Sequence, residues 1–378
     1  MQRANKFRTT AGQLTGTSLE NTHSRPIFIM GLFSFPSFST AELAAKQQIG
    51  PPTPQEAPQK ARQSTTVATP VAKQRCYVQN FKRIRELGRS TEGTIELARE
   101  KSSGTVRVFK TVGPRTGVPS GKLCREARAL SLLQSVAAHQ NIIRMIHAEE
   151  MPDGCTVMCL WYCNGGDLWD QMMRFHDLLM AAPRLFILHC LISVGEALAF
   201  IHHGFVRGER HGEYCRACET SILLTHRDIK PENIFLDFSS TEYGMPIIKL
   251  SDFGQADTTF DQGGGTTGYR SPEMEHANAL ITIKSDTYSM AVTMFELCEG
   301  FGGQKWPCGL DPSLLKLNKR LAGLGITDFL RRCLTVSPDL RLAMNKEGGL
   351  SDITAFRELR EKLAKTEPIR SSVWNQKV

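Results

Sequence analysis

The sequence of 378 residues has no long hydrophobic run. A helix that crosses a membrane needs about 20 consecutive, mainly apolar residues. The best candidate, residues 27–35, is much shorter and is followed directly by Pro36. The sequence therefore predicts no membrane span.

Cysteine is absent from the first 75 residues, and the eleven cysteines, from Cys76 onward, are scattered through the rest of the chain. Small secreted domains instead carry closely spaced cysteines that pair as disulfides. The scattered pattern favours reduced thiols. We therefore expect the protein to be intracellular, in the cytoplasm or the nucleus.

Acidic residues are scarce in residues 1–75, which contain three of them against nine lysines and arginines. Most of the formal net charge of +8 therefore lies in this segment, and the remainder of the chain is close to neutral. A nearly neutral folded part argues against a surface that binds nucleic acid.

The same segment, residues 1–75, is rich in Thr, Ser, Gln, Ala and Pro. This composition predicts a disordered N-terminal tail. The first nineteen residues carry Arg3, Lys6 and Arg8 without an acid, and an apolar patch follows at residues 27–38. An organelle-targeting segment has such a composition. The alternative is a solvated tail whose apolar patch docks a partner.

The residues with the clearest chemistry lie between His226 and Gly254. Asp228 can accept a proton, and the cation Lys230 follows two residues later. Asn233 offers a neutral oxygen ligand, and Asp252 offers a second carboxylate after two hydrophobic runs. A base, a positive charge and two oxygen donors able to hold Mg²⁺ are what phosphoryl transfer requires.

The chain contains His-Arg-Asp, an Asn five positions after the Asp, and a later Asp-Phe-Gly. This order of residues resembles the eukaryotic-type protein kinase family. The resemblance covers about residues 76–365. It implies an α+β, two-lobed kinase fold, with a mainly β N-lobe over about 76–163 and a mainly α C-lobe over about 164–365. Residues 366–378 are then a short tail.

The resemblance also implies the chemistry: transfer of the γ-phosphate of ATP, with Mg²⁺, to a hydroxyl group of a protein substrate. Asp228 is expected to orient the hydroxyl and accept its proton, and Lys230 to neutralise charge on the phosphoryl group. Asn233 and Asp252 are expected to hold Mg²⁺. The residues Asn-Ile-Phe-Leu after Glu232 are similar to those of NIMA-related kinases.

A strand lysine and a helix glutamate complete the expected catalytic set. Lys110 ends the strand pattern of residues 106–110, and Glu126 lies sixteen residues later in a helical pattern over 123–134. In the family such a pair lets the lysine hold the α- and β-phosphates. The glycine-containing loop of residues 87–95 is expected to cover the phosphates, although Ser90 replaces its middle glycine.

The resemblance places further residues around the adenine and ribose. Leu160 is expected beside the adenine pocket, and the backbone of Cys163 is expected to bond adenine. Asp167 is expected to bond the ribose hydroxyls, to cap a helix, or both. Val108 and Phe235 differ from the usual Ala and Leu of the pocket. The full nucleotide set is Leu87, Gly88, Arg89, Ser90, Thr91, Glu92, Gly93, Thr94, Ile95, Val108, Lys110, Leu160, Trp161, Cys163, Asp167 and Phe235.

Residues 252–273 resemble an activation segment that ends in Ser-Pro-Glu. Thr266 is expected to bond Asp228 and Lys230, which favours serine or threonine over tyrosine as the substrate. Thr258 and Thr259 are candidates for phosphorylation, with Arg227 as the partner of the phosphate. The alternative is a segment that is ordered without modification.

Two further pairs are expected to support the loops. Asp286 is expected to bond the backbone of the catalytic loop, residues 226–233. Arg341 is expected to be the buried partner of Glu273, and such an ion pair is costly to break from one side. The Gly-rich stretch of residues 300–312 is short, so we expect a reduced substrate-docking helix there.

Residues 204–225 form an insert that departs from the family pattern. The insert contains His211, Cys215 and Cys218, and two cysteines in a CxxC spacing are typical metal ligands. Zinc would need a fourth ligand from His202, His203 or Cys190. The alternative is a mobile polar loop with ordinary thiols. A second functional alternative for the whole domain is a pseudokinase or scaffold that keeps the fold without turnover.

Overall fold

The computed structural model describes residues 79–90, 93–114, 123–208, 213–217, 224–258, 264–276, 280–300 and 305–374. The predictions for residues 1–75, Thr91, Glu92, His211, Cys218 and Thr259 lie outside these residues.

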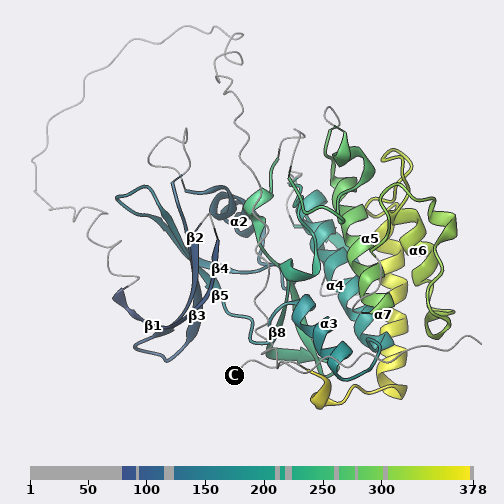
Figure 1. Ribbon diagram of the computed structural model, residues 1–378, viewed down its shortest axis with the longest axis horizontal. Coiled ribbons are helices and arrows are strands. Elements are labelled where there is room, and N and C mark those ends of the chain that lie inside the picture. Colours follow the sequence, from purple (N-terminus) through teal and green to yellow (C-terminus); the bar gives the residue numbers. More distant parts are fainter. Residues whose placement is uncertain are drawn as a thin grey trace, which may run out of the picture. The chain divides into compact units, whose positions relative to one another are not determined.

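The N-lobe is one antiparallel sheet with a helix (Figure 1). Its strands follow the order β1-β2-β3-β5-β4. They are β1 (Phe81–Ser90), β2 (Gly93–Glu100), β3 (Val106–Val112), β4 (Met145–Glu150) and β5 (Thr156–Trp161). Helix α2 (Arg125–Val136) contacts β4. A side chain at Gly93 would put its Cβ 1.6 Å from the Thr111 carbonyl oxygen, so only glycine fits there.

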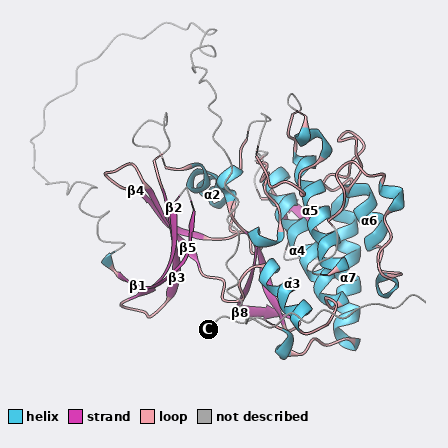
Figure 2. Ribbon diagram, viewed as in Figure 1, coloured by secondary structure: helices cyan, strands magenta, loops and turns pink. Residues whose placement is uncertain are grey.

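The C-lobe is mainly helical, and the whole domain has the expected α+β, two-lobed architecture (Figure 2). Its helices are α3 (Leu168–Asp177), α4 (Arg184–His203), α5 (Ile283–Glu299), α6 (Ile326–Cys333) and α7 (Gly349–Thr366). Helix α4 contacts α5, α7 and β9 of the hairpin formed by β8 (Ile234–Glu242) and β9 (Met245–Leu250). It is buried on every side from Leu185 to His202, which explains its apolar sequence.

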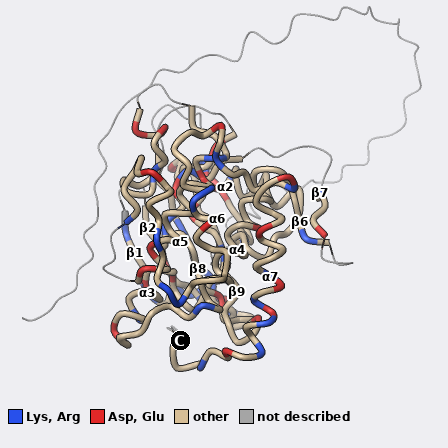
Figure 3. Tube along the Cα trace, turned by 90° about the vertical axis from the view of Figure 1, so that its right-hand side faces the viewer, with Lys and Arg blue, Asp and Glu red and all other residues tan. Residues whose placement is uncertain are grey.

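Helix α4 is also the one described helix that is long and apolar enough to cross a membrane by length and composition. Its apolar window is wholly buried inside the domain. A core helix passes the same test, and this burial identifies α4 as the core helix of the C-lobe. Basic and acidic residues are interspersed along the described chain (Figure 3).

Helix ends in the C-lobe follow from local sequence. Thr282 and Ser285 form a capping box at the start of α5, which satisfies free amide groups of the first turn. Gly204 ends α4 in the left-handed conformation. Between α5 and α6, the described residues 305–325 contain only the short 3₁₀ helices Pro312–Leu314 and Lys319–Leu321. The expected reduction of the substrate-docking helix agrees with this arrangement.

The segment after α7 is packed against the C-lobe as far as it is described. Trp374 is 5% exposed, and its indole Nε1 donates to the Gly244 carbonyl at 3.0 Å. Its ring contacts Phe186 and Phe238. The expected tail over 366–378 is therefore packed against the C-lobe as far as Trp374. The apolar contacts of this tryptophan hold it there.

The insert is a hairpin in its described part, formed by β6 (Phe205–Arg207) and β7 (Tyr214–Arg216). Tyr214 is buried, and its hydroxyl donates to Glu196 Oε1 on α4 at 2.5 Å. Arg357 on α7 also pairs with Glu196. These contacts anchor the hairpin to the core of the C-lobe.

A buried histidine makes the stability of the C-lobe depend on pH. His189 is 1% exposed; its Nε2 donates to the Pro246 carbonyl at 2.8 Å, and its Nδ1 accepts from Arg360 at 2.8 Å. Protonation would place two donors face to face. Burial, and then the charge of Arg360, lower the pKa of His189 to about 4.

We expect this histidine to destabilise the protein in weak acid. Between pH 6.5 and about pH 4, His189 is protonated in the unfolded chain and neutral in the folded chain, so stability is lost as the pH falls through this window. The free energy of unfolding falls by about 1.4 kcal/mol for each pH unit within it. In urea titrations, His189→Gln should lose less stability than the wild type between pH 7.5 and 5.5. The exposed His176→Gln is the control, and an equal loss in all three proteins would contradict the prediction.

Candidate active site

A buried carboxylate holds the backbone of the catalytic loop. Asp286 on α5 is fully buried; its Oδ2 accepts from the amide of His226 and its Oδ1 from the amide of Arg227, each at 2.7 Å. His202 Nε2 lies 2.9 Å from the same carboxylate. Burial alone would raise the pKa of Asp286, but the bonds from His202 and the backbone lower it. The structure thus places Asp286 at the loop backbone, where we expected it.

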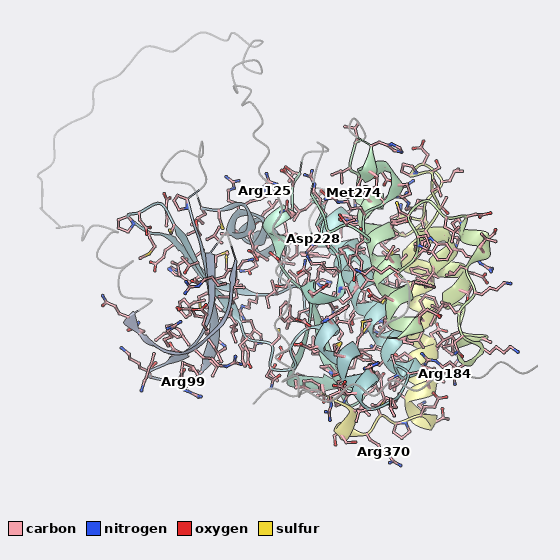
Figure 4. All side chains as sticks on the ribbon, viewed as in Figure 1. Arg99, Arg125, Arg184, Asp228, Met274 and Arg370 are labelled. Carbon is pink, nitrogen blue, oxygen red and sulfur yellow. The ribbon has the colours of Figure 1, made fainter. Side chains whose placement is uncertain are left out.

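Three predicted residues meet in a closed set of hydrogen bonds around Asp228, which is labelled in Figure 4. Thr266 Oγ1 donates to Asp228 Oδ1 at 2.7 Å. Lys230 Nζ lies 2.9 Å from Asp228 Oδ2 and donates to Thr266 Oγ1 at 2.7 Å. Because Thr266 comes from the activation segment, these bonds tie that segment to Asp228 and Lys230.

Asn233 and Asp252 present oxygen atoms next to this set. Asn233 Nδ2 donates to the Asp228 carbonyl at 2.7 Å and to its Oδ2 at 3.1 Å, which turns Asn233 Oδ1 away from both. The Ser251 amide donates to the Asn233 carbonyl at 2.9 Å. This bond holds Asp252, the next residue in the chain, near Asn233. The Asp252 side chain is 43% exposed, and its backbone is left-handed at φ +63°.

This donor set fits magnesium. Mg²⁺ prefers oxygen ligands and is held in proteins by one or two carboxylates together with substrate phosphates and water. Asn233 and Asp252 supply the protein oxygens. Elsewhere in the described ranges, no group of three or more His, Cys, Asp and Glu side chains could hold a metal ion. The zinc prediction stays a prediction, since Cys215 lies exposed on β7 and Cys218 is outside the described residues.

Lys110 on β3 bridges the two lobes. Its Nζ lies 2.6 Å from Glu126 Oε2 on α2 and 2.9 Å from Asp252 Oδ1. Burial would lower the pKa of Lys110, but the two carboxylates raise it well above its usual value. The lysine is therefore a fixed cation. Partial burial also opposes ionisation of Asp252, yet Lys110 keeps the pKa of this carboxyl low.

The predicted nucleotide residues come from both lobes. Val108 and Leu160 are paired across β3 and β5, and Leu160 is 6% exposed. Asp167 Oδ1 accepts from the Asp170 amide at 2.8 Å, so the expected helix cap is present. Phe235 forms an isolated β-bridge with Asp167. Burial raises the pKa of the Cys163 thiol well above its usual value.

The glycine-containing loop is the hairpin of β1 and β2. Leu87, Gly88 and Arg89 lie on β1, and Gly93 pairs with Ser90 at the turn. Thr94 and Ile95 follow on β2. The Arg89 guanidinium is turned to Glu86, with bonds of 3.2 Å. Trp161 turns its indole toward Asp237 on β8, a contact that the sequence did not predict.

The start of the activation segment forms an isolated β-bridge with Thr225, the residue directly before the catalytic loop. The amides and carbonyls of Thr225 and Asp257 bond each other at 2.9 and 3.0 Å. Arg227 Nε donates to Thr225 Oγ1 at 3.0 Å, and Arg125 at the start of α2 lies 3.8 Å from Asp257. The predicted site Thr258 is exposed directly after this pairing. Sequence reasoning missed Asp257, whose only signal was its place next to the candidate threonines.

Glu273 and Arg341 meet in a two-pronged ion pair, as the sequence predicted. The distances are 2.5 Å from Arg341 Nη1 to Glu273 Oε1 and 2.8 Å from Arg341 Nη2 to Glu273 Oε2. Arg341 also donates to the carbonyls of Lys284, Thr335 and Val336. Burial would raise the pKa of Glu273, but the bonds from Arg341 lower it. The pair fastens the end of the activation segment to the C-lobe.

The chain is similar to known kinases over its folded part. Mouse serine/threonine-protein kinase Nek4 is 26% identical over 220 residues, which are 57% of this chain and 24% of Nek4. Mouse Nek5 is 29% identical over 58% of this chain and 31% of its own length. The Arabidopsis thaliana receptor protein-tyrosine kinase CEPR1 is 28% identical over 55% of this chain and 22% of its own length.

The chain spans less than a third of the length of these three relatives. The expected similarity to NIMA-related kinases is confirmed, because Nek4 and Nek5 are members of that group. Residues 81–305, more than half of the chain, match the family model described as "Protein kinase domain". With its two lobes and with Lys110, Asp228 and Asp252 brought together, the chain belongs to the protein kinase family.

Proposed function

We propose that this protein transfers the γ-phosphoryl group of ATP to serine or threonine hydroxyls of protein substrates. The observation that carries the proposal is the closed set of bonds among Asp228, Lys230 and Thr266. The carboxylate of Asp228 can orient a substrate hydroxyl and accept its proton. Lys230, beside it, can neutralise charge that develops on the phosphoryl group.

Nucleotide binding is assigned to residues on both lobes. Lys110, held by Glu126, is proposed to bind the α- and β-phosphates, and the β1–β2 hairpin is proposed to cover them. Asn233 and Asp252 are proposed to hold Mg²⁺. When bound, the ion neutralises charge on the phosphate oxygens. Because Lys110 already contacts both Glu126 and Asp252, these three residues need little rearrangement before catalysis.

The choice of serine and threonine over tyrosine is supported by Thr266 at the base. Its hydroxyl oxygen lies 2.7 Å from both Asp228 Oδ1 and Lys230 Nζ. A threonine on the activation segment together with a lysine two residues after the base resembles the serine/threonine branch of the family. The names of the relatives include both classes of kinase, so this choice needs its own test.

The test is phosphoamino-acid analysis of a peptide library incubated with the full chain and Mg-ATP. We expect phosphoserine and phosphothreonine, with no phosphotyrosine. Matched peptides that differ only in Ser, Thr or Tyr at the acceptor position serve as the control. Phosphotyrosine as the main product would overturn the serine/threonine proposal. Absence of all three, in protein that is folded, would favour the pseudokinase alternative.

We also propose that residues 76–365 are the kinase domain and that the protein is intracellular. The nine cysteines in the described ranges form no disulfide with one another, which supports a reducing compartment. A fluorescent reporter fused to the full chain tests the second point. Cytoplasmic or nuclear signal is expected, and signal confined to an organelle would favour targeting by residues 1–75.

A further inference from the structure

A tryptophan at the end of β5 joins the N-lobe sheet to the C-lobe. Trp161 Nε1 donates to Asp237 Oδ2 on β8 at 2.9 Å. On β3, Arg107 is paired with Trp161, and its guanidinium carbon lies 4.6 Å from the centre of the indole ring. The contact therefore runs from β3 through the indole to a carboxylate of the other lobe.

The burial of Asp237 makes the loss of this hydrogen bond energetically costly. Asp237 is 3% exposed, so water cannot readily replace a lost donor. Its Oδ1 accepts from the Ser239 amide at 2.9 Å, and its Oδ2 is the atom that Trp161 reaches. A buried carboxylate oxygen that loses its hydrogen bond is costly, since its desolvation is no longer offset.

The hinge segment, residues 162–166, is fastened to the same strand by one backbone and one side-chain hydrogen bond. The Gly165 amide donates to the Leu236 carbonyl at 2.8 Å, and Asn164 Oδ1 accepts from the Phe238 amide at 2.8 Å. A Cβ at Gly165 would lie 2.6 Å from the Phe238 ring, so the approach requires glycine. The Trp161–Asp237 bond extends this fastening from the hinge segment back into the N-lobe sheet.

We propose that Arg107, Trp161 and Asp237 form a latch that holds the lobes in the arrangement that binds nucleotide. The three are positioning residues, and their effect on nucleotide rests on the proposed function. The indole reaches the carboxylate only while β5 and β8 keep this spacing. By raising the fraction of molecules in the competent arrangement, the latch lowers the apparent Kd for Mg-ATP.

Trp161→Phe tests the latch, because phenylalanine keeps an aromatic ring beside Arg107 but lacks the N–H group. We expect the Kd for Mg-ATP and the KM for ATP to rise roughly threefold to tenfold, the range that one hydrogen bond supports. The change in kcat should be smaller. The matched control is Trp306→Phe. Trp306 is 6% exposed, and its Nε1 has no hydrogen-bond partner in the described residues.

Variants of the acceptor give a conservative rescue. Asp237→Asn keeps an oxygen that can accept from the indole, whereas Asp237→Leu does not. We expect the Kd to rise less in the asparagine variant than in the leucine variant. Arg107→Met removes the stacked cation and should raise the Kd by about twofold, since such contacts are weak at partly exposed sites. If Trp161→Phe fails to fold, the Kd values of Asp237→Asn and Arg107→Met test the latch in its place.

Hydrogen exchange without nucleotide separates the latch from the proposed function. In Trp161→Phe, amides of residues 156–168 should exchange several times faster than in wild type and in Trp306→Phe. Exchange that is unchanged, or a Kd that rises equally in both tryptophan variants, overturns the latch. A wild type that binds no nucleotide would instead overturn the proposed function, and the exchange comparison would still decide the latch.

Discussion

Replacing Asp228 with asparagine is expected to lower the rate of phosphoryl transfer by about 10²–10⁴-fold, the range typical for loss of a general base. Asparagine has nearly the same shape and can still accept the bond from Thr266. It cannot take up the proton of the substrate hydroxyl, however, and it no longer balances the charge of Lys230. The rate is measured as phosphate incorporated into a peptide, and Mg-ATP binding is measured separately by calorimetry.

The calorimetry distinguishes a chemical loss from a folding loss. Asp228→Asn should bind Mg-ATP with a Kd within a few-fold of wild type, because Lys110 and Asp252 are unchanged. The control is Asp328→Asn, whose side chain is 80% exposed and pairs with Arg331 on the surface of α6. Equal incorporation by wild type and Asp228→Asn would show that this carboxylate is not the base.

Replacing Arg341 with methionine is expected to destabilise the protein by about 3–5 kcal/mol. The side chain of Arg341 is fully buried, and that of Glu273 is 8% exposed. The variant would leave a buried carboxylate without its cation and three backbone carbonyls without their donor. Urea unfolding followed by far-UV circular dichroism gives the free energy.

Two companions test this explanation. Arg332→Met breaks an ion pair with Asp352 whose arginine is 47% exposed, and it should cost less than about 1 kcal/mol. The double variant Glu273→Gln/Arg341→Met removes both charges and should recover part of the loss. If Arg341→Met and Arg332→Met cost the same, the buried pair has no special role in stability.

The sequence by itself determined which residues are candidates for the site. Asp228, Lys230 and Asn233 lie within six residues, and their spacing on one tight loop leaves little freedom in how they meet. Lys110, Glu126 and Asp252 were added to the site by the resemblance to the kinase family, since a lysine and a glutamate sixteen residues apart could otherwise form an ordinary salt bridge. The α+β class followed from the resemblance of these motifs to the protein kinase family, and periodicity added only single elements such as the helical pattern over 123–134.

Only the tertiary structure decided which distant residues support that site. Trp161 was expected in the nucleotide set, and only the structure shows that its indole donates to Asp237, seventy-six positions away. Tyr214 in the insert is fixed by Glu196, and Trp374 is buried by Phe186 and Phe238. A tryptophan or tyrosine can bury its ring against any apolar surface that is near, so its sequence neighbours do not specify its partner. Such contacts depend on how the lobes and helices pack, and packing is decided by the whole chain.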